Sequence, residues 1–227
     1  MEPIYQKPMD IEARSMAIIE EHLTGVTLPE PERSILKRVI HTTADFDYTE
    51  NLCFSENAVS SALEALQRGA HIVTDTNMAL SGINKRSLHG LGCEAYCFMS
   101  DADVAEEARM RGVTRAMVSM EKACLLDGDL IFAVGNAPTA LIQLDELIRA
   151  GKLLPKLIIG VPVGFVNVVE AKELIMHRSG CRILWQRGER AAAMWRRRSV
   201  MRCCISCTGK NRIGTGEIFS TNTKYNI

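Results

Sequence analysis

Apolar residues recur along this chain in two patterns, one with the spacing of helices and the other with the length of buried strands. Helices are expected over 10–23, 31–40, 55–66, 101–111, 114–126, 137–150 and 166–177. Short β-rich runs predict strands over 71–75, 94–98, 130–134 and 157–161. Strands that alternate with helices indicate a mainly parallel sheet covered on both faces. The sequence therefore predicts a single α/β domain with a Rossmann-like, doubly wound topology.

Two glycine-containing loops follow the third and fourth predicted strands, where functional residues of such sheets usually lie. One loop is Gly135-Asn136-Ala137-Pro138, and the other runs from Gly160 to Val166. Each could offer free backbone N–H groups of a helix N-terminus to a ligand carboxylate, although ordinary turn chemistry also explains these residues. Neither loop matches the glycine motif of dinucleotide sites or the P-loop, so a nicotinamide-dependent oxidoreductase is not supported.

His41 lies where the helical pattern of residues 31–40 stops, and two threonines and two aspartates follow it. Histidine can give and take a proton near neutral pH, so this residue is a candidate general acid or base. A histidine at a helix end can also simply bond the terminal carbonyl groups. The residues alone leave both interpretations open.

Composition indicates a soluble, reduced protein. The chain has 227 residues, 47% of them hydrophobic, with a mean hydropathy of +0.01. Residues 1–10 lack the apolar core of a signal peptide, and no apolar run reaches the roughly 18 residues of a membrane helix. We therefore expect a cytoplasmic protein. Four cysteines in apolar or helical contexts are expected to be reduced core residues: Cys53, Cys93, Cys97 and Cys124.

The formal net charge of zero hides a sharp change near residue 180. Residues 181–227 carry ten Lys or Arg and only two acidic residues, with both tryptophans and four of the eight cysteines. The first 180 residues carry 17 basic and 25 acidic residues. Such a change in composition requires an explanation.

Four motifs in register carry a resemblance to a known family. They are RVIHTTADFD (38–47), DTNMALSGI (75–83), GNAPTAL (135–141) and GVPVGFV (160–166). Together they resemble the precorrin-8X methylmutases, or precorrin isomerases, of cobalamin biosynthesis over about residues 3–180. The sequence around His41 is more similar to that of the cobalt-precorrin-8 branch of the anaerobic pathway than to that of the aerobic branch.

The resemblance implies an isomerase that moves a methyl group from C-11 to C-12 of a corrin precursor and yields a cobyrinate-type product. It implies a homodimer without a redox cofactor or catalytic metal, in which His41 protonates the macrocycle. The resemblance also implies that the protein binds a small tetrapyrrole substrate, and that it binds neither nucleic acid nor a membrane. Substrate contacts map to Ser15, Arg38, Thr42, Arg115, Asn136 and Thr139. Arginines and hydroxyls suit a substrate rich in carboxylates. A non-catalytic corrinoid carrier is the alternative, and it would not need His41.

The resemblance stops at Gly180, after which the family continues with a last strand, a glycine-rich turn and an apolar helix. Residues 181–198 can be encoded by a nucleotide string that, read from its third nucleotide, gives Pro-Tyr-Ile-Val-Ala-Glu-Gly and then further glycines. We therefore expect a truncated isomerase domain over 1–180, without its last strand, and an out-of-frame basic tail over 181–227. The alternatives are a nucleic-acid-binding tail and a metal site at Cys203, Cys204 and Cys207, which lacks a further ligand pair.

Overall fold

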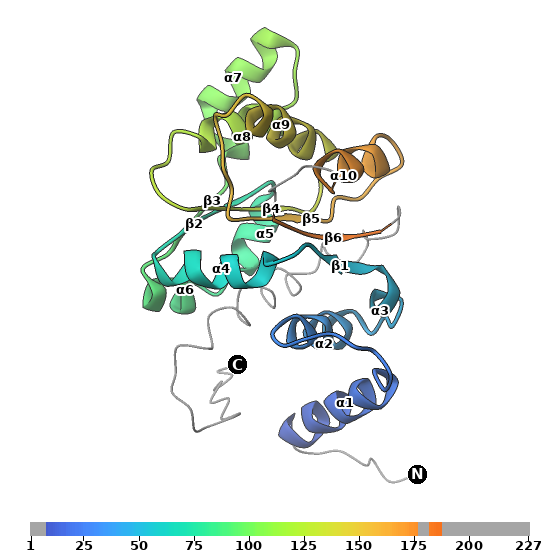
Figure 1. The fold of residues 1–227 in the computed structure, drawn as a ribbon. Coiled ribbons are helices and arrows are strands. Elements are labelled where there is room, and N and C mark those ends of the chain that lie inside the picture. The colour runs from blue at the N-terminus through green and yellow to red at the C-terminus, as the bar shows by residue number, and fades with distance from the viewer. Residues whose placement is uncertain (1–7, 177–181, 188–227) are drawn as a thin grey trace.

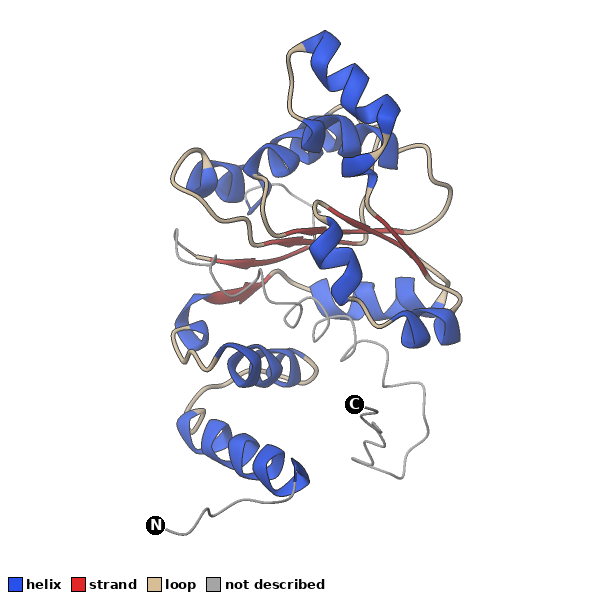
Figure 2. Ribbon diagram, turned by 180° about the vertical axis from the view of Figure 1, so that it is seen from behind, coloured by secondary structure: helices blue, strands red, loops and turns tan. Residues whose placement is uncertain are grey.

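One mixed sheet forms the centre of the protein, with helices on both of its faces (Figures 1 and 2). The computed structural model describes residues 8–176 and 182–187. Within these residues the sheet has six strands, in the order β1-β6-β5-β4-β2-β3. The strands are β1 (Leu52–Phe54), β2 (His71–Thr74), β3 (Glu94–Tyr96), β4 (Leu130–Val134), β5 (Leu157–Gly160) and β6 (Ile183–Gln186). All neighbours pair in parallel except β1 and β6. The predicted α/β class with a doubly wound, mainly parallel sheet is confirmed.

The helices form two layers. They are α1 (Pro8–His22), α2 (Glu32–Thr43), α3 (Tyr48–Asn51), α4 (Ala58–Gln67), α5 (Asn77–Gly82), α6 (Lys85–Leu91), the short 3-10 helix η1 (Phe98–Ser100), α7 (Ala102–Arg111), α8 (Arg115–Ala123), α9 (Pro138–Arg149) and α10 (Val168–Met176). In Figure 1, α7 to α10 lie above the sheet, whereas α4 to α6 and then α1 to α3 lie below it. Within the described ranges, no helix is long and apolar enough to span a bilayer.

Strand β4 shows why two layers form. All five of its residues are buried, and successive side chains point to opposite faces. Ile131 and Ala133 join the core that includes α1, α2 and α4, whereas Phe132 and Val134 join the core of α8, α9 and α10. A strand that is apolar on both faces needs cover on both, and the two helical layers provide it.

The end of α2 and the last strand differ from the sequence-based expectation. Helix α2 does not stop at Ile40 but continues to Thr43, and Ala44 then adopts a left-handed conformation and donates its N–H to the Ile40 carbonyl. The sheet also does not lack its last strand, because Ile183–Gln186 forms β6 between β1 and β5. The predicted boundary at residue 180 therefore precedes a strand of the sheet. The cysteines of the proposed metal site, 203, 204 and 207, lie outside the described residues.

The order of the strands fixes where loops diverge. Strand β2 pairs with β3 on one side and with β4 on the other. The chain therefore passes from β2 to the strand on one side of it, β3, and then crosses over to the strand on its other side, β4. In open α/β sheets, ligands bind outside the carboxyl ends of the two strands at such a switch point. Here those strands are β2 and β4, and the residues that follow them are Asp75 and Gly135.

Candidate functional site

Asp75 directly follows β2, and its carboxylate accepts hydrogen bonds from the loop that follows β4. The backbone N–H of Gly135 donates to Oδ1 at 3.1 Å, while those of Asn136 and Ala137 donate to Oδ2 at 2.7 and 2.8 Å. The Asp75 side chain is buried, with the residue 1% exposed. Burial raises the pKa of the Asp75 carboxyl, and the three N–H donors act against that rise. The carboxylate also places a negative charge at the N-terminus of α9, where the helix dipole favours it.

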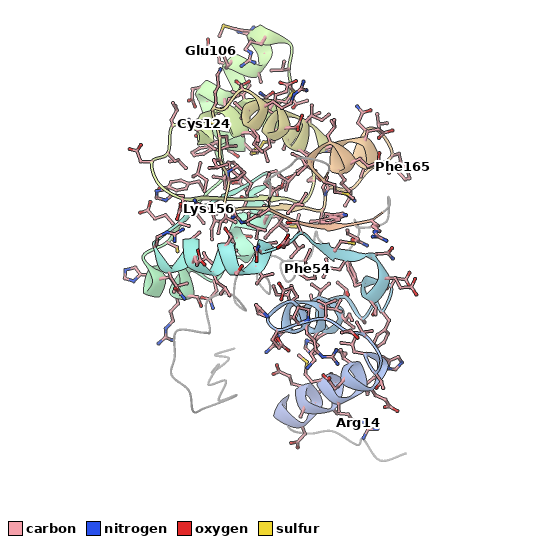
Figure 3. All side chains as sticks on the ribbon, viewed as in Figure 1. Arg14, Phe54, Glu106, Cys124, Lys156 and Phe165 are labelled. Carbon is pink, nitrogen blue, oxygen red and sulfur yellow. The ribbon has the colours of Figure 1, made fainter. Side chains whose placement is uncertain are left out.

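These contacts correct one expectation. The N–H groups of residues 135–137 are not free for a ligand carboxylate, because Asp75 already occupies them. In the second loop, Phe165 is 95% exposed and lies at the outer rim beside α10 (Figure 3). The two glycine-containing loops thus differ: the first is fixed from within by a buried acid, and the second presents an apolar ring to solvent.

The N-termini of α8 and α9 are joined by a side-chain hydrogen bond. The hydroxyls of Thr114 and Thr139 lie 2.9 Å apart, and Thr114 also caps α8 by accepting the N–H of Met117. Arg115, the first residue of α8, is exposed and makes no ion pair with any described residue. Three of the expected substrate contacts, Arg115, Asn136 and Thr139, therefore lie near one another at the switch point. The exposed guanidinium of Arg115 and the two threonine hydroxyls make this region suitable for carboxylate groups.

The other expected site residues lie on α1 and α2. Arg38 pairs with Glu12 through Nη1 and Oε1 at 3.0 Å, which joins the two helices. Ser15 lies one turn after Glu12, and its hydroxyl donates to the Ile11 carbonyl at 2.8 Å. The Ser15 hydroxyl is therefore satisfied within its own helix. Because residues three or four apart share a helix face, His41 and Thr42 lie on the same side of α2 as Arg38.

His41 is half-buried in the last turn of α2. The helix end is satisfied by the N–H of Ala44, and the His41 side chain makes no hydrogen bond to any described residue. The capping interpretation of this histidine is therefore not supported by the contacts within 8–176 and 182–187. The ring nitrogens can serve a bound molecule instead.

The two groups of expected site residues lie on opposite faces of the sheet. Helices α1 and α2 contribute to one core, and α8 and α9 contribute to the other. Figure 1 shows the same separation, with α2 below the sheet and α8 and α9 above it. The described part of one chain thus brings Arg115, Asn136 and Thr139 together but keeps them on the other side of the sheet from His41.

Two residues of this region were not singled out from the sequence. Asp75 was assigned only as the polar end of a strand and as part of a family motif, and Thr114 only as the start of a helix. The available signal for Asp75 was its position directly after a buried strand of a parallel sheet. The four cysteines expected to be reduced core residues are free thiols, but only Cys93 is buried. Partial burial raises the pKa of the thiols of Cys53, Cys97 and Cys124.

Comparison with known proteins places this arrangement in one family. The family model of precorrin-8X methylmutase matches residues 10–194. The cobalt-precorrin-8 methylmutase of Leptospira interrogans is 43% identical over 169 residues, which are 74% of this chain and 77% of the relative. That of Salmonella typhimurium is 42% identical over 179 residues, covering 76% and 83% of the two chains.

The fold matches as well as the sequence does. The solved structure of a precorrin-8X methylmutase from Thermus thermophilus aligns with a TM-score of 0.77 and 33% identity, covering 89% of this chain and 99% of that one. A second solved structure, of a precorrin-8X methylmutase related protein, aligns with a TM-score of 0.73 and 25% identity. On these sequence and structural matches, the chain belongs to the precorrin-8X methylmutase family, the isomerases of cobalamin biosynthesis.

Proposed function

We propose that this protein converts cobalt-precorrin-8 into a cobyrinate-type product by moving a methyl group from C-11 to C-12. The carbon–methyl bond at C-11 breaks and a new one forms at C-12, so the composition of the substrate does not change and no oxidant or reductant is consumed. The relatives named for this substrate support the choice of the cobalt form. The observation that carries the proposal is the half-buried ring of His41, which has no hydrogen-bond partner among the described residues.

His41 has the role of proton donor and acceptor in this proposal. A proton placed on the macrocycle makes the methyl migration favourable, and the same imidazole can take the proton back. The carboxylates of the substrate would bind Arg115, Asn136 and Thr139 at one edge and Ser15, Arg38 and Thr42 at the other. The free thiols of the four described cysteines agree with action in the reducing cytoplasm.

Replacing His41 by Ala separates this proposal from the carrier alternative. Positioned acid–base groups contribute about 10²- to 10⁴-fold to rate, so the conversion should slow by that factor while corrinoid binding persists. His89, exposed in the last turn of α6, is the matched control, and His89→Ala should convert substrate at the wild-type rate. Product formation followed by absorbance and mass spectrometry measures both. A His41→Ala protein as active as wild type would rule out the catalytic role and favour a carrier.

We also propose a homodimer in which each site is shared. One chain holds the two groups of site residues on opposite faces of its sheet, and a two-fold partner can bring its own α1–α2 pair to the α8–α9 edge. Mixing inactive His41→Ala and Arg115→Ala chains would then restore activity, because half the dimers carry one intact site. The recovery should reach about a quarter of wild type. No recovery on mixing, or a monomer in sedimentation, would refute the shared site.

A further inference from the structure

We propose that Asp75 is the positioning residue of the corrin-binding site, fixing the Gly135–Ala137 loop and the start of α9 in the geometry that substrate binding needs. This rests on the function proposed above, but it concerns a residue outside the expected catalytic and binding set. Asp75 touches no expected site side chain. It acts through the backbone that carries Asn136 and Thr139.

The contacts of the Asp75 carboxylate are difficult to replace. Three consecutive N–H groups converge on two oxygens at 2.7–3.1 Å, in a place where the acid is 1% exposed. An asparagine of the same shape has a single acceptor oxygen, and its NH₂ group would face a backbone N–H. At least one buried N–H would lose its partner, and an unsatisfied buried donor is costly.

The strand end that carries Asp75 is itself rigidly held. The Thr74 hydroxyl lies 3.1 Å from the Thr76 carbonyl and 3.2 Å from the Tyr96 carbonyl, so it binds the end of β2 to β3 and to the next turn. The Thr76 hydroxyl then accepts the N–H of Ala79 and caps α5. Asp75 therefore transmits the position of a fixed strand to a loop that has no strand pairing of its own.

The effect extends from α9 to α8. Thr139 lies in the first turn of α9, and its hydroxyl bonds Thr114, the residue before Arg115. A shift of the 135–137 loop would thus displace all three expected contacts at the switch point together. Asp75 would control affinity for the substrate more than the methyl shift itself, because the group proposed to handle the proton, His41, is on the other face.

The test compares Asp75→Asn with Asp145→Asn. Asp145 is an equally buried carboxylate, 2% exposed, on α9 but away from its N-terminus. Both variants should lose stability, whereas only Asp75→Asn should raise KM, by ~10-fold with kcat within ~3-fold, as removal of uniform binding does. It should also weaken binding of cobyrinic acid by a similar factor and speed hydrogen exchange at the amides of residues 135–137.

The outcomes are distinguishable. An equal change of KM in both variants, or an unchanged KM with fast exchange at 135–137, overturns the positioning role. If Asp75→Asn does not fold, Ala137→Pro keeps the acid and removes one of the three donors, and a smaller rise of KM is expected. If wild type binds cobyrinic acid without converting substrate, the proposed function fails while the binding and exchange readouts still decide the role of Asp75. If wild type binds no corrinoid, both proposals fail.

An independent observation concerns β6. Trp185 Nε1 and Gln186 Oε1 are buried and have no hydrogen-bond partner among the described residues. Only three such side-chain atoms occur in the described ranges, and two of them lie in β6, a strand of just four residues. A strand that lies between β1 and β5 is flanked by neighbours on both sides and should be apolar on both faces.

We infer that β6 is encoded out of frame and that the intact gene specifies an apolar strand at the same place in the sheet. With the codons assumed for residues 181–198, the alternative frame replaces Ile183–Gln186 by Tyr-Ile-Val-Ala, which has no side-chain polar atom at the positions of Trp185 and Gln186. The test is the nucleotide sequence of the gene read from the third nucleotide of codon 181. An apolar strand, a glycine-rich turn and a small-residue helix without a stop codon are expected. A stop codon or a polar sequence in that frame would overturn the inference.

Discussion

Lys172 lies in the middle of α10 and is 2% exposed, an unusual place for an ammonium group. Burial lowers its pKa from 10.5 to about 8. The unfolded chain therefore binds the proton more tightly than the folded protein does. Between pH 8 and 10.5 the unfolded state holds more protons, so the free energy of unfolding should rise with pH across that window.

The size of the effect follows from the pKa shift. Each pKa unit corresponds to 1.36 kcal/mol, so the charged, buried lysine costs the folded state about 3 kcal/mol below pH 8. Replacing Lys172 by Met keeps the length of the side chain and removes the charge. The stability of Lys172→Met relative to wild type should therefore be greater at pH 7 than above pH 10.5, by about 3 kcal/mol.

Urea unfolding of both proteins at several pH values between 7 and 11 measures this difference. Other groups titrate over the same range, but they cancel when one curve is subtracted from the other. Lys152, an exposed lysine, is the control, since its side chain stays in water when the protein folds. Lys152→Met should change the unfolding free energy by a small, constant amount. A difference between wild type and Lys172→Met that is the same at pH 7 and pH 11 would refute the reasoning.

Two further predictions concern packing. Gly69 has φ +84°, and a Cβ there would lie 2.9 Å from the Gly92 carbonyl oxygen, whereas at Gly112, with φ +66°, a Cβ would meet nothing within 4 Å. Gly69→Ala should therefore lower the unfolding free energy more than Gly112→Ala, which carries only the cost of about 1–2 kcal/mol for a left-handed residue; equal losses in urea unfolding would contradict the clash. Phe132→Ala should cost roughly 3–5 kcal/mol, because this fully buried ring fills the core between β4 and the α8–α10 layer. A loss below about 1 kcal/mol would show that the core closes around the cavity.

The periodic parts of the fold were predictable from sequence because each carries its own signal. The β4 run Leu130–Val134 is apolar throughout, and its bounds were predicted correctly. Strand β1, by contrast, has three residues and pairs with a strand far along the chain, so no local sequence pattern indicates it. Helices α5 and α6 were missed because they are short, at six and seven residues.

The candidate site was likewise predictable only where the signal is local in the sequence. Gly135 and Pro138 correctly indicated a turn into a helix, but their pattern could not reveal that Asp75, 60 residues earlier, takes the N–H groups of that turn. Residue types suited to carboxylates were recognisable at Arg115 and Arg38. That these arginines lie on opposite faces of the sheet depends on the crossover directions, which the sequence does not specify locally.

The position of β6 between β1 and β5 also affects how the protein can be made. The N–H of Ile183 donates to the hydroxyl of Ser55, a contact between residues 128 apart in the chain. At 5–20 residues per second, a ribosome needs roughly 6 to 25 s to add that length. Throughout this interval β1 lacks the strand that it pairs with in the described part of the chain, so this edge of the sheet forms only after β6 has been made. A chain made without residues 183–186 would therefore keep β1 without its strand partner.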